Sequence, residues 1–77
     1  MKELIELVEE VTGLTVGSLP KETDLVKALG IDSLTGLRIL AAVEKRYGIR
    51  FPDSELKRYR TLSAIDAFLK KEGVKET

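Results

Sequence analysis

The chain has 77 residues, enough for one domain with a modest, mostly aliphatic hydrophobic core. It contains no cysteine and no histidine, which excludes disulfides and removes the commonest general base and zinc ligand. We therefore expect a single domain over residues 1–77 that is not an enzyme, with no catalytic residue and no metal site.

Net charge is zero, but the charges are unevenly distributed. Residues 1–32 carry three cations and seven carboxylates, or −4, whereas residues 33–60 carry seven cations and three carboxylates, or +4. Acidic and apolar positions interrupt the basic part, which disfavours nucleic-acid binding. No apolar run approaches the roughly 18 residues of a membrane span, and no signal-peptide pattern is present. We expect a cytoplasmic protein without membrane insertion.

The first helix is predicted over residues 2–12, where one face is apolar and four glutamates lie mostly outside it. The apolar positions are Leu4, Ile5, Val8 and Val11. The helix should end at Gly13, because a glycine followed by an apolar residue is typical of a left-handed C-terminal cap. The same pair recurs at Gly48 and Gly73, which favours an all-helical chain.

A long connection follows over residues 14–32, and it contains too many apolar residues for a loose linker. We expect it to pack across the helices, with a turn of helix around Asp24–Leu29. A loop of this length is often functional.

The central helix is predicted from Ser33 to Tyr47, with Asp32 as its N-cap. Its core face contains Ile39, Leu40, Val43 and Tyr47. Gly36 points toward this face, where it would allow the neighbouring short helix or a prosthetic arm to approach closely. A tolerated weakness near the helix start is the alternative for Gly36.

A second apolar stripe on the same helix cannot easily be buried in so small a domain, and we interpret it as a contact surface. It consists of Leu34, Leu37 and Ala41, with Arg38 and Lys45 along its edge. In the alternative interpretation, Leu34 lies under the long loop and only Leu37 is exposed.

After the central helix, the sequence predicts one short helix over 53–60, with Leu56 and Tyr59 facing inward. A last helix is predicted over 62–71, with Thr61 as its N-cap. The expected fold is an all-α, four-helix bundle with three main helices, one short helix and a long first loop. We expect a monomer whose core includes Val8, Ile39, Val43, Tyr47, Phe51, Ile65 and Phe68.

The chain resembles the acyl carrier proteins in three features. These are the string Leu29-Gly30-Ile31-Asp32-Ser33-Leu34, the position of that string in the chain, and the order of the helices. The resemblance covers almost the whole length. It implies that Ser33 is esterified with 4′-phosphopantetheine taken from coenzyme A, and that Asp32 and Leu34 are read by the modifying phosphopantetheinyl transferase. The missing histidine and cysteine then agree with the function, because the arm brings the reactive sulfur.

The resemblance also implies a discrete carrier of thioester intermediates. Its other partners would be an acyl-loading ligase or acyltransferase and a ketosynthase or another acyl-processing enzyme. The partner surface would comprise Leu34, Leu37, Arg38, Ala41 and Lys45.

This chain departs from the family in its charge, because the central helix presents Arg38, Lys45 and Arg46 where fatty-acid carriers present carboxylates. We interpret the departure as a sign of a specialised fatty-acid, polyketide or related pathway. Two alternatives remain open: an aryl or aminoacyl carrier, and an unmodified protein-interaction module of the same fold.

Overall fold

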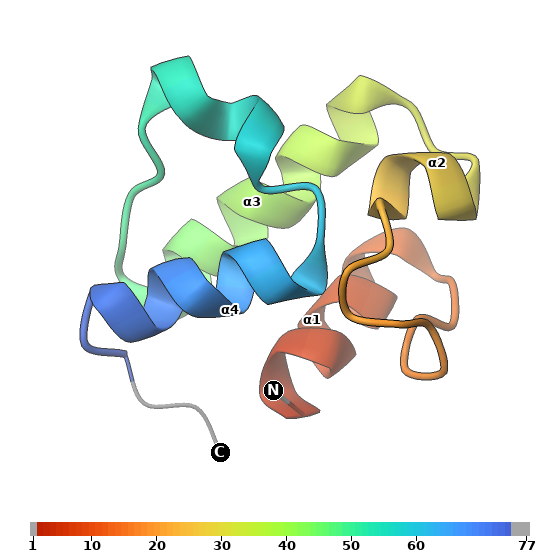
Figure 1. Ribbon diagram of the computed structural model, residues 1–77, viewed down its shortest axis with the longest axis horizontal. Helices are drawn as coiled ribbons and strands as arrows, with labels where there is room; N and C mark the ends of the chain where they lie inside the picture. Colours follow the sequence, from red (N-terminus) through yellow and green to blue (C-terminus); the bar gives the residue numbers. More distant parts are fainter. Residues whose placement is uncertain (1, 75–77) are drawn as a thin grey trace.

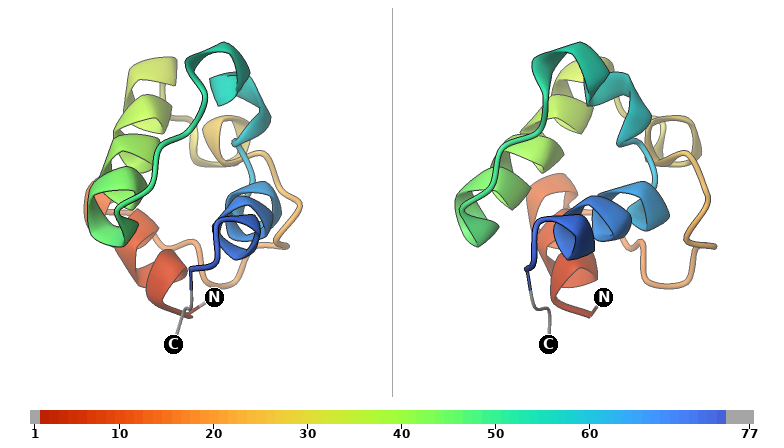
Figure 2. Two further views of the ribbon diagram at one scale, coloured as in Figure 1. Left: turned by 90° about the vertical axis from the view of Figure 1, so that its left-hand side faces the viewer. Right: turned by 60° about the vertical axis from the view of Figure 1, so that its left-hand side comes forward.

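The structure is a computed structural model that describes residues 2–74 (Figure 1). It confirms the all-α fold. In chain order the elements are α1 (Lys2–Thr12), α2 (Leu25–Leu29), α3 (Ser33–Tyr47), the 3₁₀ helix η1 (Asp53–Arg58) and α4 (Leu62–Lys71). Figure 2 shows α2 and η1 at the end of the molecule where α3 begins, with α1 and α4 toward the other end. None of the helices in residues 2–74 is long and apolar enough to cross a membrane, and the cytoplasmic location stays a prediction.

Helix α1 has the predicted bounds but a slightly different buried face. Leu4 and Val8 are fully buried and Leu7 is nearly so, whereas Ile5 and Val11 are only partly buried against the core. The predicted apolar face therefore does pack on the core, and Leu7, which the prediction left out, is buried with it. The core lies toward Leu7 because α1 packs mainly against α3.

The long connection packs onto the helices, as predicted. Val16 is completely buried and Leu25, the first residue of α2, is 2% exposed. The carboxylate of Glu9 accepts hydrogen bonds from the N–H groups of Val16 (2.8 Å) and Gly17 (3.1 Å). The prediction that Glu9 lies outside the packed face missed this role, because the loop returns to α1 only in the folded chain.

Helix α3 spans the residues predicted for it and buries Ile39, Leu40 and Val43. Tyr47 is only partly buried, so its assignment to the core needs correction. It is the last residue of the helix, and the chain leaves the core at Gly48, which has a left-handed φ of 67°. The predicted left-handed conformations at Gly13 and Gly73 are also present.

The C-terminal half closes the core with an aromatic cluster. Phe51 is 1% exposed, and its ring centroid lies 4.8 Å from that of Tyr59 and 4.6 Å from that of Phe68. The short element before Tyr59 is a 3₁₀ helix that ends at Arg58, shorter than the predicted 53–60. Leu56 and Tyr59 face the core but are only partly buried.

Helix α4 begins where the sequence predicts. The hydroxyl of Thr61 accepts a hydrogen bond from the N–H of Ala64 at 3.0 Å, which caps the helix. Ile65 and Phe68 are buried, in agreement with the expected core.

The two faces of α3 should respond differently to substitution. Val43 is fully buried, so Val43→Ala should lower the free energy of unfolding by about 1–3 kcal/mol through the cavity it creates. Ala41 is exposed, so Ala41→Ser should lower it by no more than about 0.5 kcal/mol. Urea unfolding of both variants measures the difference, and equal losses would contradict this assignment of the faces.

Candidate functional site

The start of α3 is fixed by Asp32, which is its N-cap. One carboxylate oxygen of Asp32 accepts a hydrogen bond from the N–H of Thr35 at 2.8 Å, and the Asp32 carbonyl accepts from the N–H of Gly36 at 3.1 Å. The bond from the Thr35 N–H is the largest cause that lowers the pKa of the Asp32 carboxyl below its ordinary value. Arg38 lowers this pKa further through its charge. Asp32 therefore caps α3 as a carboxylate.

Ser33 is the first residue of α3, and its side chain is exposed. Asp32 satisfies the N–H groups of Thr35 and Gly36, whereas those of Ser33 and Leu34 have no partner in the part of the chain that the structure describes. These two N–H groups and the positive end of the helix dipole favour an anion beside the hydroxyl. The position suits a phosphodiester on Ser33.

Ser33 also lines a cavity of about 470 Å³ that lies between α2, α3, η1 and the start of α4 and is open to solvent on one side. Its walls are mostly apolar, with polar residues from η1 and the segment after it. The lining residues used below are Val26, Ser33, Leu37, Leu56, Lys57 and Arg60.

Gly36 lines the same cavity, and its neighbour bears on one prediction. A Cβ on Gly36 would lie 3.2 Å from a methyl group of Val26, so the element that approaches closely is α2 and not the short helix η1. Close approach of a short helix is thus confirmed, with α2 as that helix, and approach of the prosthetic arm stays a prediction. The alternative of a merely tolerated glycine does not account for this contact.

The second apolar stripe of α3 lies at the surface. Leu34 is 59% exposed and Leu37 is 44% exposed, and Ala41, Arg38 and Lys45 are exposed as well. The alternative that placed Leu34 under the long loop is wrong. What binds to this stripe stays a prediction.

Arg46, the third cation of the expected basic row, has a structural partner. Its Nε lies 3.2 Å from a carboxylate oxygen of Glu3 on α1. This pair joins α1 to α3, so Arg46 contributes to packing between the helices and is a weaker candidate for partner recognition than Arg38 and Lys45.

A comparison with known protein families decides the assignment. Residues 2–69 match the family described as "Phosphopantetheine attachment site". The chain belongs to this family. Acyl carrier proteins of several bacteria are among its relatives, and the chain carries acyl intermediates on a covalent 4′-phosphopantetheine arm rather than catalysing a reaction itself. The unmodified interaction module is thereby disfavoured.

Two relatives illustrate how far the similarity extends. The "Meromycolate extension acyl carrier protein" of Mycolicibacterium aurum is 37% identical over 68 residues, which cover 88% of this chain and 70% of that protein. The "Acyl carrier protein" of Rhodococcus erythropolis is 38% identical over 69 residues, which cover 90% of this chain and 76% of that protein. A carrier of this family is a substrate for a phosphopantetheinyl transferase and for acyl-processing enzymes.

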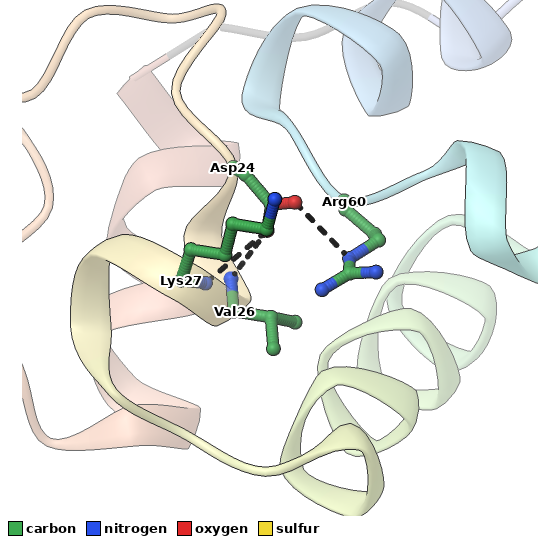
Figure 3. Close-up of polar contacts among 4 residues, drawn as sticks. All are labelled: Asp24, Val26, Lys27 and Arg60. Atoms are coloured by element: carbon green, nitrogen blue, oxygen red, sulfur yellow. Dashed lines mark hydrogen bonds and ion pairs between the residues drawn. The ribbon is translucent and has the colours of Figure 1, made fainter.

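Sequence reasoning missed two charged residues beside the cavity of this carrier, Asp24 and Arg60. The carboxylate of Asp24 caps α2 and lies 3.3 Å from Nε of Arg60, which lines the cavity (Figure 3). An aspartate directly before Leu25-Val26 is an N-cap signal that could have been recognised. The pairing with Arg60 had no comparable signal.

The cap at Asp32 predicts a specific dependence of stability on pH. Because folding lowers the pKa of the Asp32 carboxyl, its stabilising contribution is complete above the ordinary pKa of 3.8 and is lost as pH falls through the lower folded value. Asp32→Ala should therefore lower the melting temperature at pH 7, and its difference from the parent should shrink in acid.

Asp32→Asn is the matched control, since asparagine caps a helix without a titrating charge. Its melting temperature at pH 7 should stay close to that of the parent, and its difference from Asp32→Ala should persist at low pH. A loss in Asp32→Ala that is constant from pH 7 down to pH 2 would contradict the role of the ionised carboxylate.

Proposed function

We propose that Ser33 is the residue that carries the 4′-phosphopantetheine arm of this acyl carrier protein. The observation that carries the proposal is the position of its exposed hydroxyl, at the first residue of α3 and at the edge of the cavity. The N–H groups of Ser33 and Leu34 are available to the phosphodiester. Asp32 and Leu34, which flank the hydroxyl and are both exposed, are the residues we propose the transferase reads.

Modification of Ser33 can be tested directly by mass spectrometry. Incubation with coenzyme A and a promiscuous phosphopantetheinyl transferase should add one phosphopantetheine to the parent chain, and Ser33→Ala should abolish the addition. The fold should survive, because Asp32 still caps α3.

The chain offers a matched control for this test. Ser54 is exposed and lines the same cavity from η1, so Ser54→Ala should be modified as completely as the parent. A modified Ser33→Ala protein, or loss of modification in Ser54→Ala alone, would refute the assignment of Ser33.

The surface that we propose for partner enzymes is the outer face of α3, called here the outer α3 surface. It combines two large exposed apolar side chains with two exposed cations, in the neighbourhood of Ser33. Its residues are Leu34, Leu37, Arg38, Ala41 and Lys45. A cationic rim of this kind fits an enzyme surface that is less basic than usual, or acidic.

For the pathway we propose extension of a fatty-acyl chain, with a ketosynthase and an acyl-loading enzyme as partners. The named relatives support this choice, since one of them is called a carrier of meromycolate extension and both are called acyl carriers. These names also favour an acyl group over an aryl or aminoacyl group.

Charge on the outer α3 surface should set the rate at which the loading enzyme meets the carrier. The double variant Arg38→Glu/Lys45→Glu should lower kcat/KM of the cognate loading enzyme by about tenfold at low salt, because complementary charges accelerate association. The effect should shrink on going to 0.5 M salt, since screening shortens the range of exposed charges.

The control variant for this experiment is Lys21→Glu/Lys71→Glu, which changes net charge equally but places both substitutions outside α3. It should be loaded at nearly the parent rate. If the two double variants are loaded equally fast, the cations of α3 have no part in recognising the partner.

A further inference from the structure

The cavity beside Ser33 contains a cation at a fixed position, and this cation has consequences for the acyl group. Arg60 lies directly after η1 and Tyr59, and its side chain lines the cavity together with Val26 and Leu37. Its carbonyl accepts a hydrogen bond from the N–H of Leu25 at 2.8 Å. The backbone of Arg60 is therefore tied to the start of α2.

The side chain of Arg60 is held by Asp24. Nε of Arg60 lies 3.3 Å from one carboxylate oxygen of Asp24, whose other oxygen accepts from the N–H groups of Val26 (3.0 Å) and Lys27 (3.3 Å). Figure 3 shows the guanidinium beside Val26, with its two terminal nitrogens turned away from the Asp24 carboxylate. Within residues 2–74 these two nitrogens have no ion-pair or hydrogen-bond partner.

An acyl group that enters the cavity must accommodate these donors. A saturated chain would displace water from the guanidinium without replacing its hydrogen bonds, which is unfavourable. An acyl group with an oxo or hydroxyl oxygen would accept a hydrogen bond from a terminal nitrogen. The donors therefore disfavour a plain alkyl chain.

The surrounding charges decide between a neutral oxygen and a carboxylate. Asp24 already balances the charge of Arg60, and the cavity wall also carries one carboxylate, Asp53, and one cation, Lys57, so these four charges sum to zero. A third carboxylate would find no unbalanced cation to pair with, whereas a neutral oxygen uses the donors without adding charge.

We propose that Arg60 makes this cavity selective for acyl groups bearing a neutral oxo or hydroxyl oxygen over saturated acyl groups of the same length. The inference rests on the proposed attachment of the arm to Ser33. The side chain of Arg60 is 38% exposed, so water satisfies part of it, and the preference should be about three- to tenfold rather than larger.

The experiment measures how well the protein shields the thioester. Hexanoyl, 3-oxohexanoyl, 3-hydroxyhexanoyl and 5-carboxypentanoyl pantetheine arms are attached enzymatically, and loading is confirmed by mass spectrometry. Cleavage by a small thiol is timed for each loaded protein and for the corresponding free pantetheine thioester. The ratio of the free rate to the protein-bound rate is a protection factor that cancels the intrinsic reactivity of each acyl group.

In the parent, the 3-oxo and 3-hydroxy groups should have protection factors about three- to tenfold above that of hexanoyl, and the carboxylate should have none of this advantage. Arg60→Met should remove the advantage and leave protection of hexanoyl unchanged or higher. Arg58→Met is the matched control, because Arg58 is exposed, pairs with Glu55 and does not line the cavity. It should behave as the parent.

A second variant keeps the proposal testable if Arg60→Met fails to fold. Asp24→Asn retains a side chain that caps α2 but removes the charge that balances Arg60. It should raise protection of the 5-carboxypentanoyl group relative to hexanoyl.

Three outcomes would overturn the role of Arg60. The parent could protect all four groups equally, or it could protect the carboxylate most. The preference for the oxo group could also persist in Arg60→Met. Failure of every arm to attach to Ser33 would instead refute the proposed attachment site.

Discussion

The hydrogen bond from the N–H of Thr35 to the carboxylate of Asp32 fixes where α3 begins, and the site depends on that position. With the cap at Asp32, Ser33 becomes the first helical residue and its hydroxyl is exposed at the positive end of the helix. Farther along the helix each residue turns by about 100°, so Ile39 and Val43 share one face and both enter the core. A shift of the cap by one residue would move Ser33 away from the first position of the helix.

Side chains on the helices hold the long connections of this small domain in place. Glu9 on α1 binds the backbone of Val16 and Gly17, and Glu44 on α3 accepts a hydrogen bond from the N–H of Phe51 at 2.7 Å. Such bonds satisfy backbone groups that have no partner in regular secondary structure. They allow a chain with only five helical elements between residues 2 and 74 to bury Val16 and Phe51 almost completely.

The cavity is a consequence of how α2 is held. This helix has five residues, too few to be stable alone, and it depends on its cap at Asp24 and on its contacts with the segment after η1. Gly36 allows Val26 to come within 3.2 Å of its Cβ position, so α2 closes one side of the space next to Ser33. The charged pair of Asp24 and Arg60 lies at this same junction. Stability of α2 and the chemistry of the cavity wall are therefore provided by the same residues.

The sequence alone determined the limits of α1, α3 and α4, the buried face of α3 except for Tyr47, and the candidate residue Ser33. Caps at Asp32 and Thr61, the glycine at Gly48 and apolar periodicity are local signals, and each acts through residues within a turn or two along the chain. Only the tertiary structure decided that Leu7 is more buried than Ile5, that Gly36 meets α2, and that Arg60 lies beside Asp24. These contacts depend on how whole elements pack. The pair of Asp24 and Arg60 is separated by 36 positions and joins a five-residue helix to a loop, where no periodic pattern exists to predict it.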